Sequence, residues 1–131
     1  MTDTKNRSAR IEHANLTVAD PQASAELMQT LFGWHIRWEG PAMLGGYTVH
    51  VGSDDDYIAF YTNAEIRAAA PKFTKGVPLN HVGILVDDLD AVEAKVIAAG
   101  LEPFSHGDYE PGRRFYFFDS NGIEFEIVSY A

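Results

Sequence analysis

The chain has 131 residues, carries a formal net charge of −9 at pH 7, and contains no cysteine. Its length suits one domain and is too short for a catalytic domain beside a separate cofactor domain. The negative net charge and the absence of a lysine or arginine cluster exclude a nucleic-acid-binding surface and attraction to an anionic membrane. The lack of cysteine excludes disulfides, thiolate metal sites and a cysteine nucleophile.

The start of the chain predicts a tail rather than a targeting segment. Residues 1–10 are polar and lack the apolar run of a signal peptide. No later stretch approaches the roughly 18 apolar residues of a membrane span. We therefore expect a disordered tail over residues 1–10 and a single domain over residues 11–131, in a cytoplasmic protein whose partners are small molecules or a second copy of the chain.

The domain opens with a strand and a helix. Apolar and polar residues alternate over residues 11–18, which predicts a strand with His13 and Asn15 on its polar face. A helix should begin after Asp20, an N-cap residue followed by proline, and end at Gly33.

Three further strands should complete a first module. A strand is expected over residues 34–38, then a loop over residues 39–46. Residues 47–51 and 57–62 predict a hairpin around an acidic turn. The first module, residues 11–62, therefore follows the order βαβββ.

The second half repeats this order after a linker. Residues 63–78 contain prolines, a glycine and an alanine-rich stretch, which predicts a linker with at most a short helix. The second module, residues 79–130, starts with a strand over residues 79–86. The N-cap of its helix is assigned to Asp90, with Glu93 completing a capping box.

The last hairpin shows the duplication most clearly. Residues 45–62 align without a gap on residues 112–129, which sets Glu126 opposite Ala59. The Asn-Gly turn predicts that Phe118 pairs with Ile123. The fold class is thus α+β, with two tandem βαβββ modules whose mixed sheets form a cup and whose helices cover the outer face.

Strand alternation indicates which side chains line this cup, because alternate residues share a face. The histidines that open each module, His13 and His81, pass this test, and so does Glu126 on the last strand. The other expected lining residues are Asn15, Thr48, Tyr57, Ala59, Phe115 and Phe117.

Two imidazoles and one carboxylate form a three-ligand set with open positions, suited to a divalent Fe, Mn, Ni, Co or Zn ion. We therefore assign His13, His81 and Glu126 as metal ligands. The competing interpretation is that the two histidines descend from one ancestral residue and are hydrogen-bonded in a wet core, with Glu126 solvated.

Two residues of the same face are candidates for catalysis. His50 can take and give protons near neutral pH. Glu124, two residues before Glu126, can orient a ligand or a water molecule. The predicted turn pairing sends Tyr116 to the helix side, and Arg114 is expected in solvent.

The module openings, both His-x-x-x-x-Val-x-Asp, and the segment DSNGIEFE at residues 119–126 carry a family resemblance. Over residues 11–130 the chain resembles the vicinal oxygen chelate superfamily, which includes glyoxalase I, extradiol dioxygenases, methylmalonyl-CoA epimerase and the fosfomycin- and bleomycin-resistance proteins. The resemblance implies ligand positions at His13, Ala59, His81 and Glu126. Ala59 departs from the four-ligand pattern of glyoxalase I, and the remaining three match the dioxygenase and fosfomycin-transferase pattern.

The resemblance implies a small metalloenzyme that chelates adjacent oxygens of a small-molecule substrate and catalyses a lyase, dioxygenase or transferase reaction. The alternative is a metal-free protein of the bleomycin-resistance type that sequesters an antibiotic or aromatic compound. A regulatory relative without a ligand is a third reading. Modules of this family often pair across chains, so a homodimer is implied. If the modules pair across chains here, His13 would come from one subunit and His81 with Glu126 from the other, and pairing within one chain is the alternative.

Overall fold

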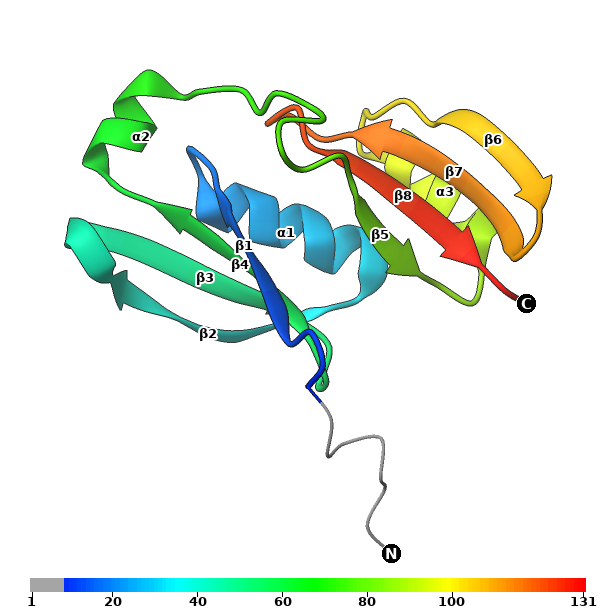
Figure 1. The fold of residues 1–131 in the computed structure, drawn as a ribbon, viewed down its shortest axis with the longest axis horizontal. Coiled ribbons are helices and arrows are strands. Elements are labelled where there is room, and N and C mark those ends of the chain that lie inside the picture. The colour runs from blue at the N-terminus through cyan, green and yellow to red at the C-terminus, as the bar shows by residue number, and fades with distance from the viewer. Residues whose placement is uncertain (1–8) are drawn as a thin grey trace, which may run out of the picture.

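A computed structural model describes residues 9–131 as two four-stranded sheets that lie side by side, each with a helix behind it (Figure 1). Of the tail predicted over residues 1–10, residues 1–8 lie outside the described part of the chain. Over residues 9–131 no helix is both long and apolar enough to cross a bilayer. The predicted α+β fold with two βαβββ modules is confirmed.

The first module forms one sheet in the order β1-β4-β3-β2. Strand β1 pairs in parallel with β4, and the other neighbours are antiparallel. Its elements are β1 (His13–Thr17), α1 (Pro21–Phe32), β2 (His35–Ala42), a short 3-10 turn (Met43–Gly45), β3 (Gly46–Gly52) and β4 (Tyr57–Thr62). The loop predicted over residues 39–46 is wrong in its first half, because β2 continues in register with β3 to Ala42.

The second module repeats the topology in the order β5-β8-β7-β6. The linker carries the short helix α2 (Ala64–Ala69), and the module contains β5 (Val82–Leu85), α3 (Leu89–Ala98), β6 (Phe104–Tyr109), β7 (Gly112–Phe118) and β8 (Glu124–Ser129). The predicted first strand, residues 79–86, is therefore longer than the observed β5.

The helices begin where short acidic side chains cap them. Asp20 accepts a hydrogen bond from the Ala23 amide at 3.1 Å and starts α1, as predicted. In the second module Asp88, not Asp90, accepts from the Ala91 amide at 3.0 Å and starts α3. The capping box assigned to Asp90 is therefore wrong, since Asp90 instead forms an ion pair with Arg113 on β7.

A single core lies between the sheets and the helices. Helix α1 packs on β3 and β4, α3 packs on β7 and β8, and the two helices touch each other. The fully buried large side chains are Val18, Met28, Leu31, Val49, Val51, Phe60, Val96, Phe115, Phe117, Ile123, Phe125 and Ile127. Each sheet therefore buries one face and leaves the other open, which is the arrangement that an alternating pattern predicts.

The register of the last hairpin differs by one residue from the prediction. Phe118 pairs with Glu124, not with Ile123. The cause is the turn, because the Asp119 carboxylate accepts hydrogen bonds from the amides of Asn121 and Ile123, both at 2.9 Å, and the Asp119 amide donates to the Ile123 carbonyl. The loop thus closes at Ile123 and is longer than the tight Asn-Gly turn that was expected.

This shift reverses the faces of β7, since a slip of one residue turns every side chain over. Phe115 and Phe117 are fully buried in the core, so their predicted place in the cup lining is wrong. Tyr116 and Arg114 pair with Glu126 and Val128 and share their open face. The expectation that Tyr116 lies on the helix side is wrong for the same reason.

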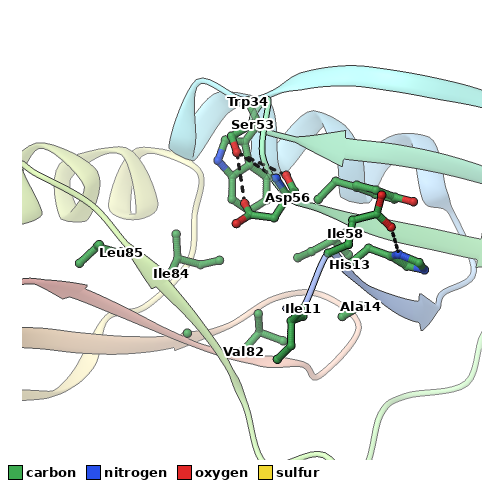
Figure 2. A pocket seen from close by; sticks show the side chains of 13 residues that line it. Ile11, His13, Ala14, Trp34, Ser53, Asp56, Ile58, Val82, Ile84 and Leu85 are labelled. Atoms are coloured by element: carbon green, nitrogen blue, oxygen red, sulfur yellow. Dashed lines mark hydrogen bonds and ion pairs between the residues drawn. The ribbon is translucent and has the colours of Figure 1, made fainter. Parts of the chain in front are cut away.

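The neighbouring edges of the two sheets are β1 and β5, and a pocket of about 500 Å³ lies between them. Figure 2 shows Ile11 and His13 on the β1 side of this pocket and Val82, Ile84 and Leu85 on the β5 side. His13 therefore lies at the seam between the modules.

Candidate metal centre

The open face of the first sheet carries the predicted residues of that module. The register sets Asn15, Ala59 and His50 in one row across β1, β4 and β3. A second row holds His13 and Tyr57. Ala59 is only 1 % exposed. The small side chain at the fourth family position is therefore covered by its neighbours.

Three rings stand in a stack along this face. The His13 and Tyr57 rings are 4.8 Å apart and nearly parallel at 10°, and the His50 ring lies 4.6 Å from Tyr57 on a 23° tilt. Trp38 closes the row at 5.4 Å from His50. Thr48, two residues before His50, lies on the same face but is buried. The stack holds the plane of the His13 ring.

One nitrogen of His13 is already engaged. Its Nδ1 lies 2.8 Å from the Glu12 carboxylate, the contact drawn as a dashed line from His13 in Figure 2. This hydrogen bond lowers the pKa of Glu12 below its usual value, although partial desolvation opposes the shift. Because an ionised carboxylate only accepts, Nδ1 carries the proton and Nε2 of a neutral His13 presents its lone pair.

His50 differs electrostatically from a solvated histidine. Burial lowers its pKa below 6.5, and the nearby charges of His13 and Arg37 lower it further, while Glu12 opposes the shift. Burial therefore favours the neutral imidazole of His50, which is the form that can accept a proton.

The second module brings His81 and Glu126 together. Nε2 of His81 lies 2.9 Å from Oε1 of Glu126, and the two side chains are 32 % and 12 % exposed. Nδ1 of His81 lies 2.8 Å from Oδ1 of Asn80. The amide orientation of Asn80 is fixed by Lys75, whose Nζ can only donate and lies 3.1 Å from the same oxygen.

With these contacts in place, the His81–Glu126 pair needs a positive ion between its two facing atoms. Because Asn80 presents an oxygen, Nδ1 of His81 must donate to it, and a neutral imidazole then has only a lone pair at Nε2. That lone pair faces a carboxylate oxygen at 2.9 Å, so the contact is attractive only when a positive ion lies between the two atoms. A proton meets this requirement, and so does a metal ion.

Glu126 has a second partner in Arg114. Nη1 of Arg114 donates to Oε2 of Glu126 at 2.8 Å, and the guanidinium lies over the Tyr109 ring at 4.5 Å. Burial is the largest single effect and opposes the charged form of Arg114, but the hydrogen bond to Glu126 together with the charges of Glu126, Tyr109 and Tyr116 outweighs it, so the pKa of the guanidinium lies above its usual value. Burial and the charge of Glu126 also raise the pKa of Tyr116.

Beside His81 lies a pocket of about 400 Å³. Its lining residues are Lys75, Asn80, His81, Phe104, Ser105, Tyr109, Tyr116 and Glu124. The Glu124 side chain is 8 % exposed, and its oxygen lies 3.4 Å from Nζ of Lys75. The pocket thus combines aromatic walls, one carboxylate and one ammonium next to the His81–Glu126 pair.

The sequence places this architecture in a known group. A profile of the Glyoxalase/Bleomycin resistance protein/Dioxygenase superfamily matches residues 10–127. The chain belongs to this superfamily. Comparison with curated proteins finds no match.

Solved structures of the superfamily share the fold at low sequence identity. A glyoxylase/bleomycin resistance protein/dioxygenase domain from Frankia sp. EAN1pec is 20% identical, with a TM-score of 0.80 over 93% of this chain and 98% of that chain. The fosfomycin resistance protein FosX from Listeria monocytogenes, complexed with Mn(II) and sulfate, is 16% identical, with a TM-score of 0.71 over 93% of each chain. Glyoxalase I from Leishmania major is 16% identical, with a TM-score of 0.75 over 94% and 88%.

Within one chain of this superfamily member, the predicted ligands fall into two groups. His81 and Glu126 are in contact, whereas His13 lies on the open face of the other sheet. Among residues 9–131 no three histidine, aspartate or glutamate side chains converge on a point where they could hold a metal ion. The expected ligand set is therefore not gathered by a single chain.

Three residues around this centre, Glu12, Lys75 and Asn80, were not predicted from the sequence. The expectation that Arg114 lies in solvent is wrong, because its side chain is 11 % exposed and bonds Glu126. A polar acceptor directly before each opening histidine, Glu12 before His13 and Asn80 before His81, was a readable signal within the duplication. Arg114 could be recognised only with the correct register of β7. Lys75 belongs to the irregular linker, and no periodicity predicts its position.

Proposed function

We propose that this chain is a metal-dependent enzyme of the vicinal oxygen chelate type, in which His13, His81 and Glu126 hold a divalent Fe, Mn, Ni, Co or Zn ion. The observation that carries the proposal is the contact between Nε2 of His81 and Oε1 of Glu126 at 2.9 Å, beside an Nδ1 that is already bound to Asn80. FosX of Listeria monocytogenes, which shares the fold, is complexed with Mn(II).

The geometry of the pair fits a metal ion. Bonds from a divalent ion of this series to imidazole nitrogen or carboxylate oxygen are about 2.0–2.2 Å long, so two such ligands would be about 3 Å apart on an octahedral ion. The His81–Glu126 separation of 2.9 Å agrees with that spacing. Both histidines also have Nδ1 bound to an acceptor, which orients Nε2 for coordination.

We infer that the third ligand comes from a second copy of the chain. His13 is apart from His81 and Glu126 in one chain, yet its Nδ1 is bound to an acceptor in the same way and it has the same position in its module as His81. In a symmetric dimer, His13 of each chain would meet His81 and Glu126 of the other. Two equivalent sites would result.

The substrate is a small molecule with adjacent oxygens, and the reaction is of the lyase, dioxygenase or transferase class. A divalent cation in this site supplies Lewis-acid stabilisation of the anion that develops on those oxygens. His50, whose lowered pKa favours the neutral imidazole, is the residue we assign to accept a proton. Glu124 lines the pocket beside His81 and orients the substrate or a water there.

A second candidate is a metal-free protein that sequesters an aromatic or antibiotic compound. It is favoured by the chain of contacts from Arg114 through Glu126 to His81, which is complete when a proton lies on Nε2. The aromatic rings of Phe104 and Tyr116, which line the pocket beside His81, would then face the ligand.

Metal content decides between the two candidates. Plasma mass spectrometry should find near-stoichiometric metal in untagged protein and its loss in His81→Ala and Glu126→Ala. The matched control is His106→Ala, which breaks a similar pair, Nε2 of His106 to Oε2 of Glu93 at 2.6 Å, on the helix side of the sheet. This control should keep its metal. Protein that stays empty when offered these ions, with variants that fold normally, would contradict the enzyme and favour the binding protein.

A further inference from the structure

The two oxygens of Glu126 have different partners. Oε1 faces Nε2 of His81 at 2.9 Å, and Oε2 accepts from Nη1 of Arg114 at 2.8 Å. The carboxylate is 12 % exposed and its position is set from both sides. If Oε1 is the atom that meets a metal ion, Oε2 is already bound to a cation of the protein.

Arg114 is itself held in place. Its Nε and Nη2 donate to the Gly112 carbonyl at 3.3 and 3.0 Å, and its guanidinium stacks on Tyr109 at 4.5 Å. The side chain is 11 % exposed. A planar guanidinium fixed on several sides loses little freedom when it binds one more acceptor. Arg114 is therefore a rigid donor and does not swing freely between the carboxylate and solvent.

The number of carboxylate oxygens on the metal decides how many positions a substrate can use. Two imidazoles and one carboxylate oxygen leave about three positions on an octahedral ion, and a second carboxylate oxygen would fill one of them. A carboxylate can chelate through both oxygens when both are free. Substrate with two adjacent oxygens needs two neighbouring positions, and a water or co-reactant needs one more.

We propose that Arg114 is a positioning residue that restricts Glu126 to one-oxygen coordination and so keeps a metal position open for a bidentate oxygen substrate. This inference rests on the proposed function. The same hydrogen bond draws carboxylate charge toward the guanidinium, which leaves the cation a stronger Lewis acid toward anionic oxygens.

The test uses Co(II), whose visible absorption reports its coordination, and acetohydroxamate, a small chelator with two adjacent oxygens. Co(II) and then acetohydroxamate are titrated into wild type, Arg114→Met and Arg114→Lys. The matched control is Arg113→Met, because Arg113 directly precedes Arg114 on β7 but points to the helix side and pairs with Asp90 at 2.8 Å. Circular dichroism shows that each variant is folded.

Arg114→Met is expected to bind Co(II) at least as tightly as wild type, because a neighbouring positive charge is gone and Glu126 can use both oxygens. Its Co(II) spectrum should differ from that of wild type, and its affinity for acetohydroxamate should fall by about tenfold or more. Arg114→Lys, which restores a cation near Oε2, should recover part of that affinity. Arg113→Met should match wild type in all measurements.

Three results would overturn the inference. Equal spectra and equal acetohydroxamate affinity in wild type and Arg114→Met would show that Glu126 is not restricted. A parallel loss of Co(II), acetohydroxamate and thermal stability in both Arg114 variants would assign a purely structural role. Wild type that binds no Co(II) would overturn the proposed function together with the inference, and this failure is distinguishable because it appears before any variant is compared.

Discussion

Replacement of Asn80 by alanine tests the logic of the site without touching a proposed ligand. The Asn80 oxygen lies 2.8 Å from Nδ1 of His81 and is the reason that His81 presents a lone pair at Nε2. Without that acceptor, His81 can carry its proton on Nε2 and donate to Oε1 of Glu126. The pair then satisfies itself without an added cation.

The expected loss of metal affinity follows from the energy of one hydrogen bond. Metal binding to Asn80→Ala must first break the new hydrogen bond between Nε2 and the carboxylate, and a hydrogen bond to a charged group contributes about 1.5–3 kcal/mol. At 1.4 kcal/mol for each tenfold change, metal affinity should fall by about 10- to 150-fold. The folded state should keep its stability, since His81 and Glu126 stay paired.

Isothermal titration with Mn(II) and Zn(II) measures this change. Asn80→Asp is the matched variant, because an aspartate accepts the same proton and should retain at least the wild-type affinity. Thermal denaturation checks that both variants are folded. Equal metal affinity in Asn80→Ala and wild type would refute the tautomer argument, and so would an equal loss in Asn80→Ala and Asn80→Asp.

Three further predictions follow from the fold and the proposed dimer. Phe117→Ala should lower the free energy of unfolding by about 3–5 kcal/mol in urea denaturation, since Phe117 is fully buried and stacks on Phe125 at 5.3 Å, whereas a loss below about 1 kcal/mol would contradict the observed register. The pKa of His50 is lowered in the folded state, so the unfolded chain takes up a proton more readily below pH 6.5. In urea titrations, wild type should therefore lose stability relative to His50→Gln between pH 7.5 and pH 5.5. Parallel pH profiles of the two proteins would contradict this. When His13→Ala and His81→Ala chains are mixed and exchange subunits, about half of the dimers contain one chain of each kind, and each such dimer holds one complete site. Plasma mass spectrometry should then count about a quarter of the wild-type metal sites. No recovery of metal in exchanged dimers would exclude shared ligands.

Much of the fold could be predicted because it depends on local signals that act independently in each module. Helix α1 begins at the side-chain cap of Asp20 and ends at the left-handed Gly33. The hairpin of β3 and β4 lies where alternation predicted it. The duplication supplied the order of the second module. Periodicity and capping chemistry are sufficient for such features.

The errors arose where two local signals compete. Asp88 and Asp90 are both acceptable caps, and only the ion pair between Asp90 and Arg113 across the fold separates them. In the last hairpin, Asn-Gly signalled a tight turn, but the side chain of Asp119 bonds two amides and lengthens the loop. That single residue reversed the predicted faces of Phe115 and Phe117.

The candidate site was predictable in part because strand alternation indicates which side chains share a face. Glu126 lies on β8 and His81 directly precedes β5, and the two side chains are in contact. The neighbours that set their geometry, Lys75 and Arg114, come from an irregular linker and from a strand whose register was misjudged. Assembly of His13 with the pair depends on how chains associate, which one sequence does not specify.

The central claim is that a metal ion lies between Nε2 of His81 and Oε1 of Glu126. The most direct measurement is an anomalous-difference map from crystals grown with Mn(II). We expect a peak within bonding distance of both atoms and of His13 from a second copy, with Oε2 of Glu126 still bound to Arg114. Crystals of protein saturated with Mn(II) that show no peak there, and in which His81 and Glu126 keep their direct contact, would contradict it.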